Sequence, residues 1–227
     1  MNEEFQHTTD AIHLETAKKQ RKPKSKFREY VEAILIAVIV ATLIRTSVVE
    51  AYRIPSGSME DTLLVGDFLF VNKFIYGARL PFIDKPILPA IRDPQPGDIL
   101  VFKYPEDLKR NFIKRCIAVE GQTVEIRNKV VYVDGQPLEE PYTKFLYPHQ
   151  THGVPRDNFG PVTIPKGQLF MMGDNRDNSQ DSRYWGLLDR DLVKGEAFMV
   201  YWSFNYDVPL WDIGHKIRWD RIGHLIQ

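Results

Sequence analysis

A single apolar run, from Val31 to Val49, sets the first limit on how this chain folds, because such a run is buried either in a bilayer or in a protein core. Its uncharged stretch, Ala33 to Ile44, has only twelve residues, whereas a spanning helix needs about 20. The whole run restores that length, with Glu32 and Arg45 near the ends, where long charged side chains reach the headgroups. From the apolar run alone, a buried core helix remains an alternative to a membrane span.

The charges beside the run favour a membrane span. Seven basic residues and no acidic one lie between Lys18 and Arg28, whereas Arg45 and Arg53 are the only basic residues just after the apolar stretch. The positive-inside rule therefore predicts a cytoplasmic N-terminus and an outer location from about residue 50 onward. A cleavable signal has a similar layout, but Thr46 to Ile54 contains no small-x-small pattern, so we interpret the run as an uncleaved signal anchor.

The rest of the composition excludes several kinds of partner. Lys and Arg number 30, as do Asp and Glu, so the net charge gives no reason to expect nucleic-acid binding. The single cysteine, Cys116, excludes an intrachain disulfide. His149 and His152 could be two ligands, but no Cys/His cluster has zinc spacing, so neither a metal nor another cofactor is expected.

Short β-type runs separated by turn residues predict a mainly β fold after the apolar run. These runs are Phe68–Asn72, Asp98–Tyr104, Phe112–Val119, Thr123–Ile126, Val130–Val133, Gln168–Met172 and Ala197–Trp202. Asp134-Gly135 predicts a tight hairpin turn, and the five prolines between Arg79 and Pro96 predict an irregular loop. Residues 1–30 are polar and predicted to be largely disordered. The aromatic residues of Tyr201–Trp219 are expected mainly in the core, with a lipid interface as the alternative.

The first candidate site lies in Arg53–Met59, which reads RIPSGSM. Pro55 and Gly57 bracket Ser56 and place the following Ser58 on a tight turn. Such a turn can expose a hydroxyl and leave backbone N–H groups free to face a developing oxyanion. Most Pro/Ser/Gly runs are simply turns, so this segment needs support from elsewhere.

The second candidate site lies in Asn111–Val119. If this segment is a strand, Phe112, Lys114 and Cys116 share one face, and Arg115 points to the other. Both faces are mostly apolar, which predicts a buried strand. Lys114 would act as a general base only when neutral, and burial can lower a lysine pKa from about 10.4 by about 3–5 units. A lysine paired with an acid at a strand end is the alternative.

The third candidate site lies in Met172–Gly186. Its acids and amides before Ser179 are Asp174, Asn175, Asp177 and Asn178, and Asp181, Ser182 and Arg183 follow. This density predicts a loop held by its own hydrogen bonds, with Asp181 and Arg183 available to pair. A calcium loop is the alternative, but no Glu ends the loop at the EF-hand spacing and arginines already supply cations.

Together the segments resemble bacterial type I signal peptidases, which remove signal peptides from exported proteins. The matching stretches, in the family's order, are Ile54–Leu63, Gly66–Lys73, Gly97–Phe102, Phe112–Arg115 and Gly173–Gly186. The resemblance covers the chain from about Tyr30 to its C-terminus. It departs from the family at Gln122, where Asp is common, and we expect this to affect a turn.

The resemblance implies a mainly β catalytic domain with a second, smaller β domain inserted, preceded by one transmembrane helix. The expected division is a cytoplasmic tail at 1–30, a signal anchor at 31–49 and an extracytoplasmic peptidase at 50–227. The catalytic core would comprise about 50–74, 97–122 and 166–227, and the inserted β region about 75–96 and 123–165. The expected location is the bacterial cytoplasmic (inner) membrane, with a single pass.

The resemblance also implies roles for single residues. Ser58 attacks the scissile carbonyl and forms an acyl-enzyme, and Lys114 takes its proton. Ser56 resembles the side-chain oxyanion donor beside the Ser58 backbone N–H, and Ser179 resembles the serine that orients the lysine amine. The supporting residues are Arg115, Asp174, Asp181 and Arg183.

The implied partners are preprotein signal peptides and membrane lipid, with no nucleic acid and no metal. Cleavage is expected after small residues such as Ala at the first and third positions before the cut, with the peptide bound as an extended strand at an enzyme edge. Only about four residues separate Val49 from Ile54, which predicts Ser58 near the outer membrane surface.

Other functions compete with this one. A Ser/Lys self-cleaving regulator resembles these peptidases in fold but is cytosolic and carries a DNA-binding domain. A membrane-tethered binding module would have Lys114 exposed or far from Ser58. A penicillin-binding type enzyme would need a Ser-x-x-Lys motif at Ser58, and a Ser-His-Asp triad would need His215 or His224.

Overall fold

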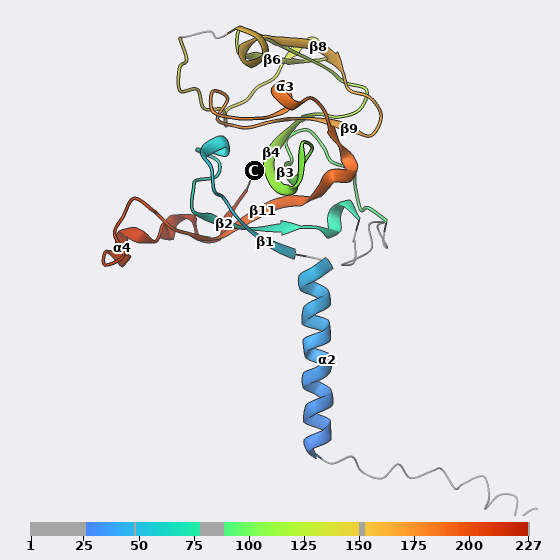
Figure 1. Cartoon of the computed structure of the whole chain (residues 1–227), viewed down its shortest axis with the longest axis vertical. Helices are drawn as coiled ribbons and strands as arrows, with labels where there is room; N and C mark the ends of the chain where they lie inside the picture. The colour runs from blue at the N-terminus through green and yellow to red at the C-terminus, as the bar shows by residue number, and fades with distance from the viewer. Residues whose placement is uncertain (1–25, 48, 78–88, 150–152, 227) are drawn as a thin grey trace, which may run out of the picture. The chain divides into compact units, whose positions relative to one another are not determined.

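The computed structural model describes residues 26–47, 49–77, 89–149 and 153–226 (Figure 1). The predicted disordered tail up to residue 25, much of the predicted proline-rich loop and His152 lie outside the described residues. The chain divides into two compact units, Met1–Thr42 and Leu43–Gln227. The mainly β fold class is confirmed by two antiparallel sheets in the second unit.

The predicted anchor falls in helix α2 (Lys26–Ser47) of 22 residues. Arg28 and Glu32 form an i,i+4 ion pair of 3.0 Å near its start. Ile34 and Leu35 are 63% and 59% exposed. Among the residues that the structure describes, no helix combines the length and the apolar character that a membrane crossing requires. The span therefore stays a prediction.

The larger sheet is eight-stranded and follows the order β1-β2-β11-β3-β4-β9-β10, with β12 paired to β11. Its strands are β1 (Val49–Arg53), β2 (Asp67–Asn72), β3 (Ile99–Tyr104), β4 (Asp107–Ala118), β9 (Gln168–Met172), β10 (Leu188–Asp189), β11 (Val193–Ser203) and β12 (His224–Leu225). Buried and partly buried side chains alternate along β2, as expected of a strand with one face on a core.

Strand β4 begins five residues earlier than the sequence predicts. Residues 107–111 are polar except for Leu108 and give no alternating apolar signal, but Asp107 and Asn111 pair with the end of β3 in a hairpin. On its other edge, β4 pairs with β9 only from Arg115 to Ala118. Within the described residues, no strand covers this second edge between Asp107 and Lys114.

The smaller sheet has the order β7-β6-β5-β8. Its strands are β5 (Thr123–Arg127), β6 (Val130–Val133), β7 (Gln136–Pro137) and β8 (Phe159–Thr163). The predicted Asp134-Gly135 turn is confirmed, with φ of 53° and 79°, a conformation that suits tight hairpins. All four strands fall between 123 and 165, although Leu43–Gln227 is one compact unit and the structure separates no inserted domain. Residues 89–96 form no strand.

Short helical turns connect the strands. They are η1 (Gly57–Met59), η2 (Phe74–Tyr76), η3 (Gly153–Asp157), α3 (Ser182–Trp185), η4 (Arg190–Leu192), α4 (Ile213–Lys216) and η5 (Trp219–Arg221). Outside α2, each described helix is thus at most two turns long.

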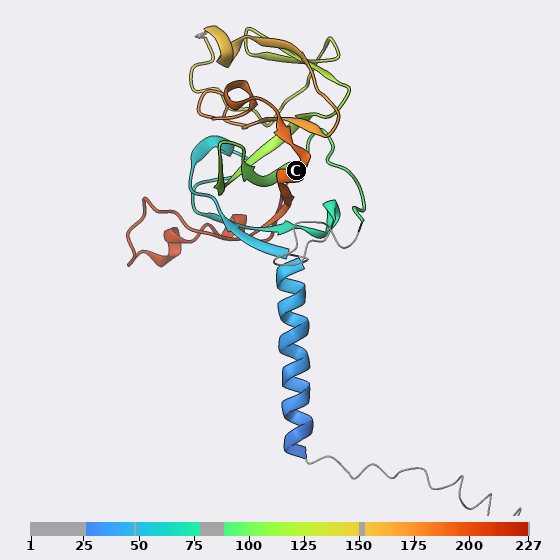
Figure 2. The ribbon, with the colours of Figure 1, turned by 45° about the vertical axis from the view of Figure 1, so that its right-hand side comes forward.

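Buried side chains tie the two sheets together. One cluster joins β4 and β9 to the smaller sheet and contains Ile117, Ala118, Val124, Ile126, Val131, Ile164, Phe170 and Met172. Both ribbon views show β6 and β8 grouped on the far side of β9 from β2 and β11 (Figure 1; Figure 2). A separate cluster under β2, β3 and β11 includes Met59 and Leu63, which anchor the segment that follows Ser58.

The prediction that the C-terminal aromatic residues lie mainly in the core is wrong for three of them. Tyr206 is 45% exposed, Trp211 is 86% exposed and Trp219 is 59% exposed. Trp202 and Phe204 are partly buried, and their rings meet edge to face at 5.7 Å. These three residues lie on the excursion between β11 and β12.

Candidate active site

Ser58 lies in the 3₁₀ turn η1, between β1 and β2. Ser56 precedes this turn in an extended conformation, and its side chain makes no capping hydrogen bond. Ser58 is 9% exposed and the next residue, Met59, is fully buried. The buried methionine therefore fixes the turn to the core while the serine meets the surface of the pocket.

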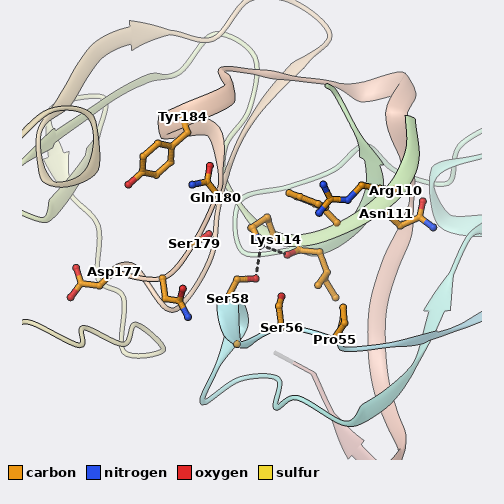
Figure 3. A pocket seen from close by; sticks show the side chains of 14 residues that line it. Pro55, Ser56, Ser58, Arg110, Asn111, Lys114, Asp177, Ser179, Gln180 and Tyr184 are labelled. Atoms are coloured by element: carbon orange, nitrogen blue, oxygen red, sulfur yellow. Dashed lines mark hydrogen bonds between the residues drawn. The ribbon is translucent and has the colours of Figure 1, made fainter. Parts of the chain in front are cut away.

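Lys114 is the second member of the site. It is 3% exposed, and its Nζ donates hydrogen bonds to Ser58 Oγ at 2.6 Å and to the Ile113 carbonyl oxygen at 3.0 Å (Figure 3). Burial lowers the pKa of Lys114 from 10.5 to about 8, although Asp181 and Asp174 act in the opposite direction. The predicted burial of Lys114 is confirmed. A binding module without catalysis would have Lys114 exposed or far from Ser58, and neither is the case here.

The two side chains open onto a pocket of about 580 Å³. Its lining residues are Pro55, Ser56, Gly57, Ser58, Arg110, Asn111, Phe112, Ile113, Lys114, Asp177, Asn178, Ser179, Gln180 and Tyr184. Figure 3 shows Ser56, Ser58 and Lys114 around the same hollow, with Tyr184 and Gln180 toward one end and Arg110 and Asn111 toward the other. A short peptide segment fits a hollow of this volume.

Asp181 and Arg183 form a buried bidentate pair, with Nε–Oδ1 and Nη2–Oδ2 distances of 2.8 Å each. Burial alone would raise the pKa of Asp181, but the Arg183 guanidinium and a hydrogen bond from the Gly173 backbone lower it overall. Arg183 also donates to the carbonyl oxygens of Arg156 and Arg176. The pair therefore holds the predicted self-bonded loop together.

Arg115 and Asp174 form a second buried pair, with distances of 2.9 Å and 2.8 Å. The guanidinium carbon lies 3.8 Å from the centroid of the Tyr142 ring. Thr62 Oγ1 donates to Asp174 Oδ2 at 2.6 Å. Asp174 thus connects β4 to the segment that follows the Ser58 turn.

Ser179 lies at the pocket, but the predicted hydrogen bond to Lys114 is not formed in this structure. Its Oγ is buried, and the hydroxyl lies near the Asp181 carboxylate, whose pKa it helps to lower. Gly173 explains part of the close packing here. A Cβ on this glycine would lie 2.3 Å from Ser179 Oγ and 2.5 Å from the Ser58 carbonyl oxygen, so a larger residue would force a shift. The orienting role of Ser179 stays a prediction.

Asn175 is a site residue that the sequence did not single out. It is fully buried, and its backbone N–H donates to the Ser58 carbonyl oxygen at 3.1 Å. Its Nδ2 donates to the Gly57 carbonyl oxygen at 3.1 Å and to Glu60 Oε2 at 3.2 Å. Asn175 therefore holds the turn that presents the Ser58 hydroxyl. Four acids and amides precede Ser179, and nothing in their order distinguishes this one.

The competing arrangements do not assemble. His215 is exposed and contacts Asp212 at 2.9 Å, and neither His215 nor His224 lines the pocket. The carboxylates considered for calcium are held by cations instead, since Asp174 and Asp181 bind arginines and Asp177 binds Lys129 at 3.0 Å. The geometry therefore favours a Ser/Lys pair.

Known proteins match the same parts of the chain. A family described as "Signal peptidase, peptidase S26" matches residues 27–202. The chain is 41% identical over 208 residues to signal peptidase I of Pseudomonas aeruginosa, covering 78% of this chain and 72% of the relative. It is 36% identical over 200 residues to signal peptidase I T of Bacillus subtilis, covering 87% and 96%. A signal peptidase I crystal structure from Enterococcus faecalis V583 matches with 31% identity and a TM-score of 0.39, covering 46% of this chain and 97% of that chain.

The burial of Lys114 predicts how stability changes with pH. Since its pKa is lowered to about 8 in the fold, the unfolded chain binds more protons between pH 8 and 10.5. The free energy of unfolding of the wild type should therefore rise relative to Lys114→Met across this window, by about 3 kcal/mol in total, and the difference should be constant below it. Urea unfolding of both full chains at several pH values measures this, and a constant difference throughout would show that the lysine is solvated.

Proposed function

Because the chain belongs to the signal peptidase family, peptidase S26, we propose that it removes signal peptides from exported preproteins, with Ser58 as nucleophile and Lys114 as general base. Membership of this family makes the chain a serine endopeptidase. The observation that carries the proposed mechanism is the 2.6 Å contact between the buried Lys114 Nζ and Ser58 Oγ.

The proposed reaction begins with neutral Lys114. Its amine accepts the hydroxyl proton as Ser58 Oγ attacks the scissile carbonyl carbon, and the lowered pKa of Lys114 makes the neutral amine available near pH 8. The resulting ammonium then protonates the leaving nitrogen as the C–N bond breaks, which leaves an ester on Ser58. The same amine next deprotonates a water molecule, whose attack on the ester releases the second product and restores Ser58.

The developing oxyanion needs hydrogen-bond donors beside Ser58. The Ser58 N–H lies in the first turn of η1, where backbone donors have no partner within the helix. Ser56 lines the same pocket, and its hydroxyl makes no capping bond, so it is available as the second donor. Ser56 and the Ser58 backbone are therefore the proposed oxyanion hole.

The remaining site residues are proposed to keep the dyad in position. The buried hydroxyl of Ser179 lies beside the same pocket and is proposed to bind the lysine amine when Ser58 turns to the substrate. The Arg115–Asp174 and Asp181–Arg183 pairs hold the loop on which Ser179 lies. The charges of these pairs change the pKa of Lys114 through long-range electrostatics.

The substrate is proposed to bind as an extended strand along β4. Among the described strands, none pairs with the edge of β4 that faces away from β3 between Asp107 and Lys114, since β9 pairs only from Arg115 onward. Added strands bind exposed edges through main-chain hydrogen bonds, and pockets for alternate side chains give specificity. Cleavage after small residues, with Ala preferred at the first and third positions before the cut, is part of the proposal.

We further propose a single-pass location in the bacterial cytoplasmic (inner) membrane, in contact with lipid. The basic charges before the apolar run at 31–49 place the 1–30 tail in the cytoplasm and residues 50–227 outside. A catalytic core with an inserted β region at about 75–96 and 123–165 belongs to the same proposal. The smaller sheet, whose strands all come from 123–163, supports it.

Ser58→Ala and Lys114→Met should each lower preprotein cleavage by at least about 10³-fold. The nucleophile and the base act as one unit, so the loss of either removes the contribution of both. Cleavage is measured by incubating the purified full chain with one preprotein and sequencing the new N-terminus. Lys103→Met, on the neighbouring strand with an exposed side chain, is the matched control and should cleave normally. Turnover retained by either dyad variant would refute the proposed mechanism.

The rate of cleavage should follow the deprotonation of Lys114. Because the free enzyme holds the lysine pKa at about 8, kcat/KM should rise about tenfold per pH unit below this value and level off above it. Initial rates with one peptide substrate from pH 6 to 10 give the profile. A flat profile through neutral and alkaline pH would contradict a lysine general base.

Ser56→Ala should lower kcat by about 10²–10³-fold with little change in KM, the usual loss for one oxyanion donor. Ser56→Thr keeps the hydroxyl and should retain most of the activity. Steady-state kinetics of both variants test the assignment. Equal activity of Ser56→Ala and the wild type would remove Ser56 from this role.

A further inference from the structure

Arg110 is the charged residue at one end of the active-site pocket. It precedes Lys114 by four residues on β4, so alternation puts Arg110, Phe112 and Lys114 on the same face of the strand. Arg110 is exposed and lines the pocket with Lys114. Figure 3 shows it at the end that also holds Asn111, away from Tyr184 and Gln180.

Aromatic rings hold this guanidinium in place. Its carbon lies 5.3 Å from the Phe112 centroid and 5.7 Å from the Tyr104 centroid. The two rings stack at 4.2 Å, and Trp185 meets Tyr104 edge on at 6.3 Å. A guanidinium over such a platform keeps its charge in a defined place instead of sampling the solvent.

The pocket offers its ligand little other charge. Lys114 is neutral when it acts as a base, and the side chain of Asp177 is fully buried against Lys129 at 3.0 Å and Arg156 at 3.8 Å. Glu106, on the same hairpin as Arg110, accepts a hydrogen bond from the Tyr104 hydroxyl. Within the described part of the chain, no carboxylate forms an ion pair with Arg110. The pocket therefore presents one positive charge.

Arg110 also has a defined distance from the reacting bond. Four residues of strand at about 3.3 Å per residue put the two Cα atoms about 13 Å apart. The Arg110 side chain folds back toward the site, since its guanidinium carbon and Lys114 Nζ lie 5.3 Å and 5.5 Å from the same Phe112 centroid. A peptide lying along the free edge of β4 advances at the same rate. The fourth residue from the scissile bond, counted toward this end of the pocket, would therefore reach the guanidinium with its side chain.

On the basis of the proposed function, we propose that Arg110 is a specificity-determining residue that selects an acidic side chain at the fourth substrate position from the cut. Asp or Glu there gains a charge-assisted contact with a guanidinium that is already ordered. Lys or Arg there meets a like charge. The contact is partly exposed, so the preference should be modest and sensitive to salt.

The test is a charge exchange between enzyme and substrate. Peptides that carry Asp, Asn or Lys at the fourth position before or after the cleavage site are cleaved by the wild type, Arg110→Gln and Arg110→Glu. For the wild type, kcat/KM for Asp should exceed that for Asn by about 2–5-fold on one side of the cut, and Lys should fall below Asn by a similar factor. Arg110→Gln should abolish the preference, Arg110→Glu should reverse it, and 0.5 M salt should weaken it.

Lys109→Glu is the matched control, because it makes the same charge change at the adjacent exposed residue, which does not line the pocket. It should keep the wild-type preference. Equal Asp-to-Lys ratios in the wild type and Arg110→Glu, or the same reversal in Lys109→Glu, would overturn the role of Arg110. Binding of the same peptides to Ser58→Ala, with and without Arg110→Glu, reads the charge preference without turnover. A failure of Ser58 or Lys114 in catalysis is thereby distinguished from a failure of Arg110 in selection.

Discussion

The site depends on the removal of water from one amine. Lys114 is 3% exposed and its pKa is lowered to about 8 by burial, although Asp181 and Asp174 lie close enough to act against this. Two unpaired carboxylates in such surroundings would keep the amine protonated. Each instead binds its own guanidinium in a bidentate pair, Asp181 with Arg183 and Asp174 with Arg115. The arginines thus neutralise the two carboxylates that hold the loop in shape, and neither carboxylate is left as a counter-ion for the lysine.

A neutral lysine is useful only if the serine stays within reach, and the loop after β9 also secures that distance. Asn175 donates from its backbone to the Ser58 carbonyl oxygen and from its side chain to the Gly57 carbonyl oxygen. Gly173 lets the same loop approach the Ser58 carbonyl oxygen closely, since a Cβ would lie 2.5 Å from it. One loop therefore controls both the electrostatic surroundings of the base and the position of the nucleophile.

Local sequence patterns predicted the parts of this arrangement that local forces determine. The strands β6 and β9 have the predicted bounds, and the alternation around Lys114 correctly indicated a buried amine. The extension of β4 to Asp107 was missed because its mostly polar residues are ordered by pairing with β3. Asn175 was missed because its partners lie 118 residues away in sequence, at Gly57. The position of the buried Ser179 hydroxyl likewise depends on tertiary packing that no spacing encodes.

The stretch that follows β7 shows why the smaller sheet is not independent of the site. Tyr142 stacks on Arg115 at 3.8 Å, and Glu140 binds both terminal nitrogens of the buried Arg176. The backbone of Lys144 donates to the Asp174 carbonyl oxygen at 2.8 Å and accepts from the Arg176 N–H at 2.9 Å. These contacts fasten the loop that carries Asn175 to a segment leading out of the smaller sheet. Because the same contacts close the compact unit Leu43–Gln227, a change that loosens the smaller sheet should reach the serine and the lysine through this loop.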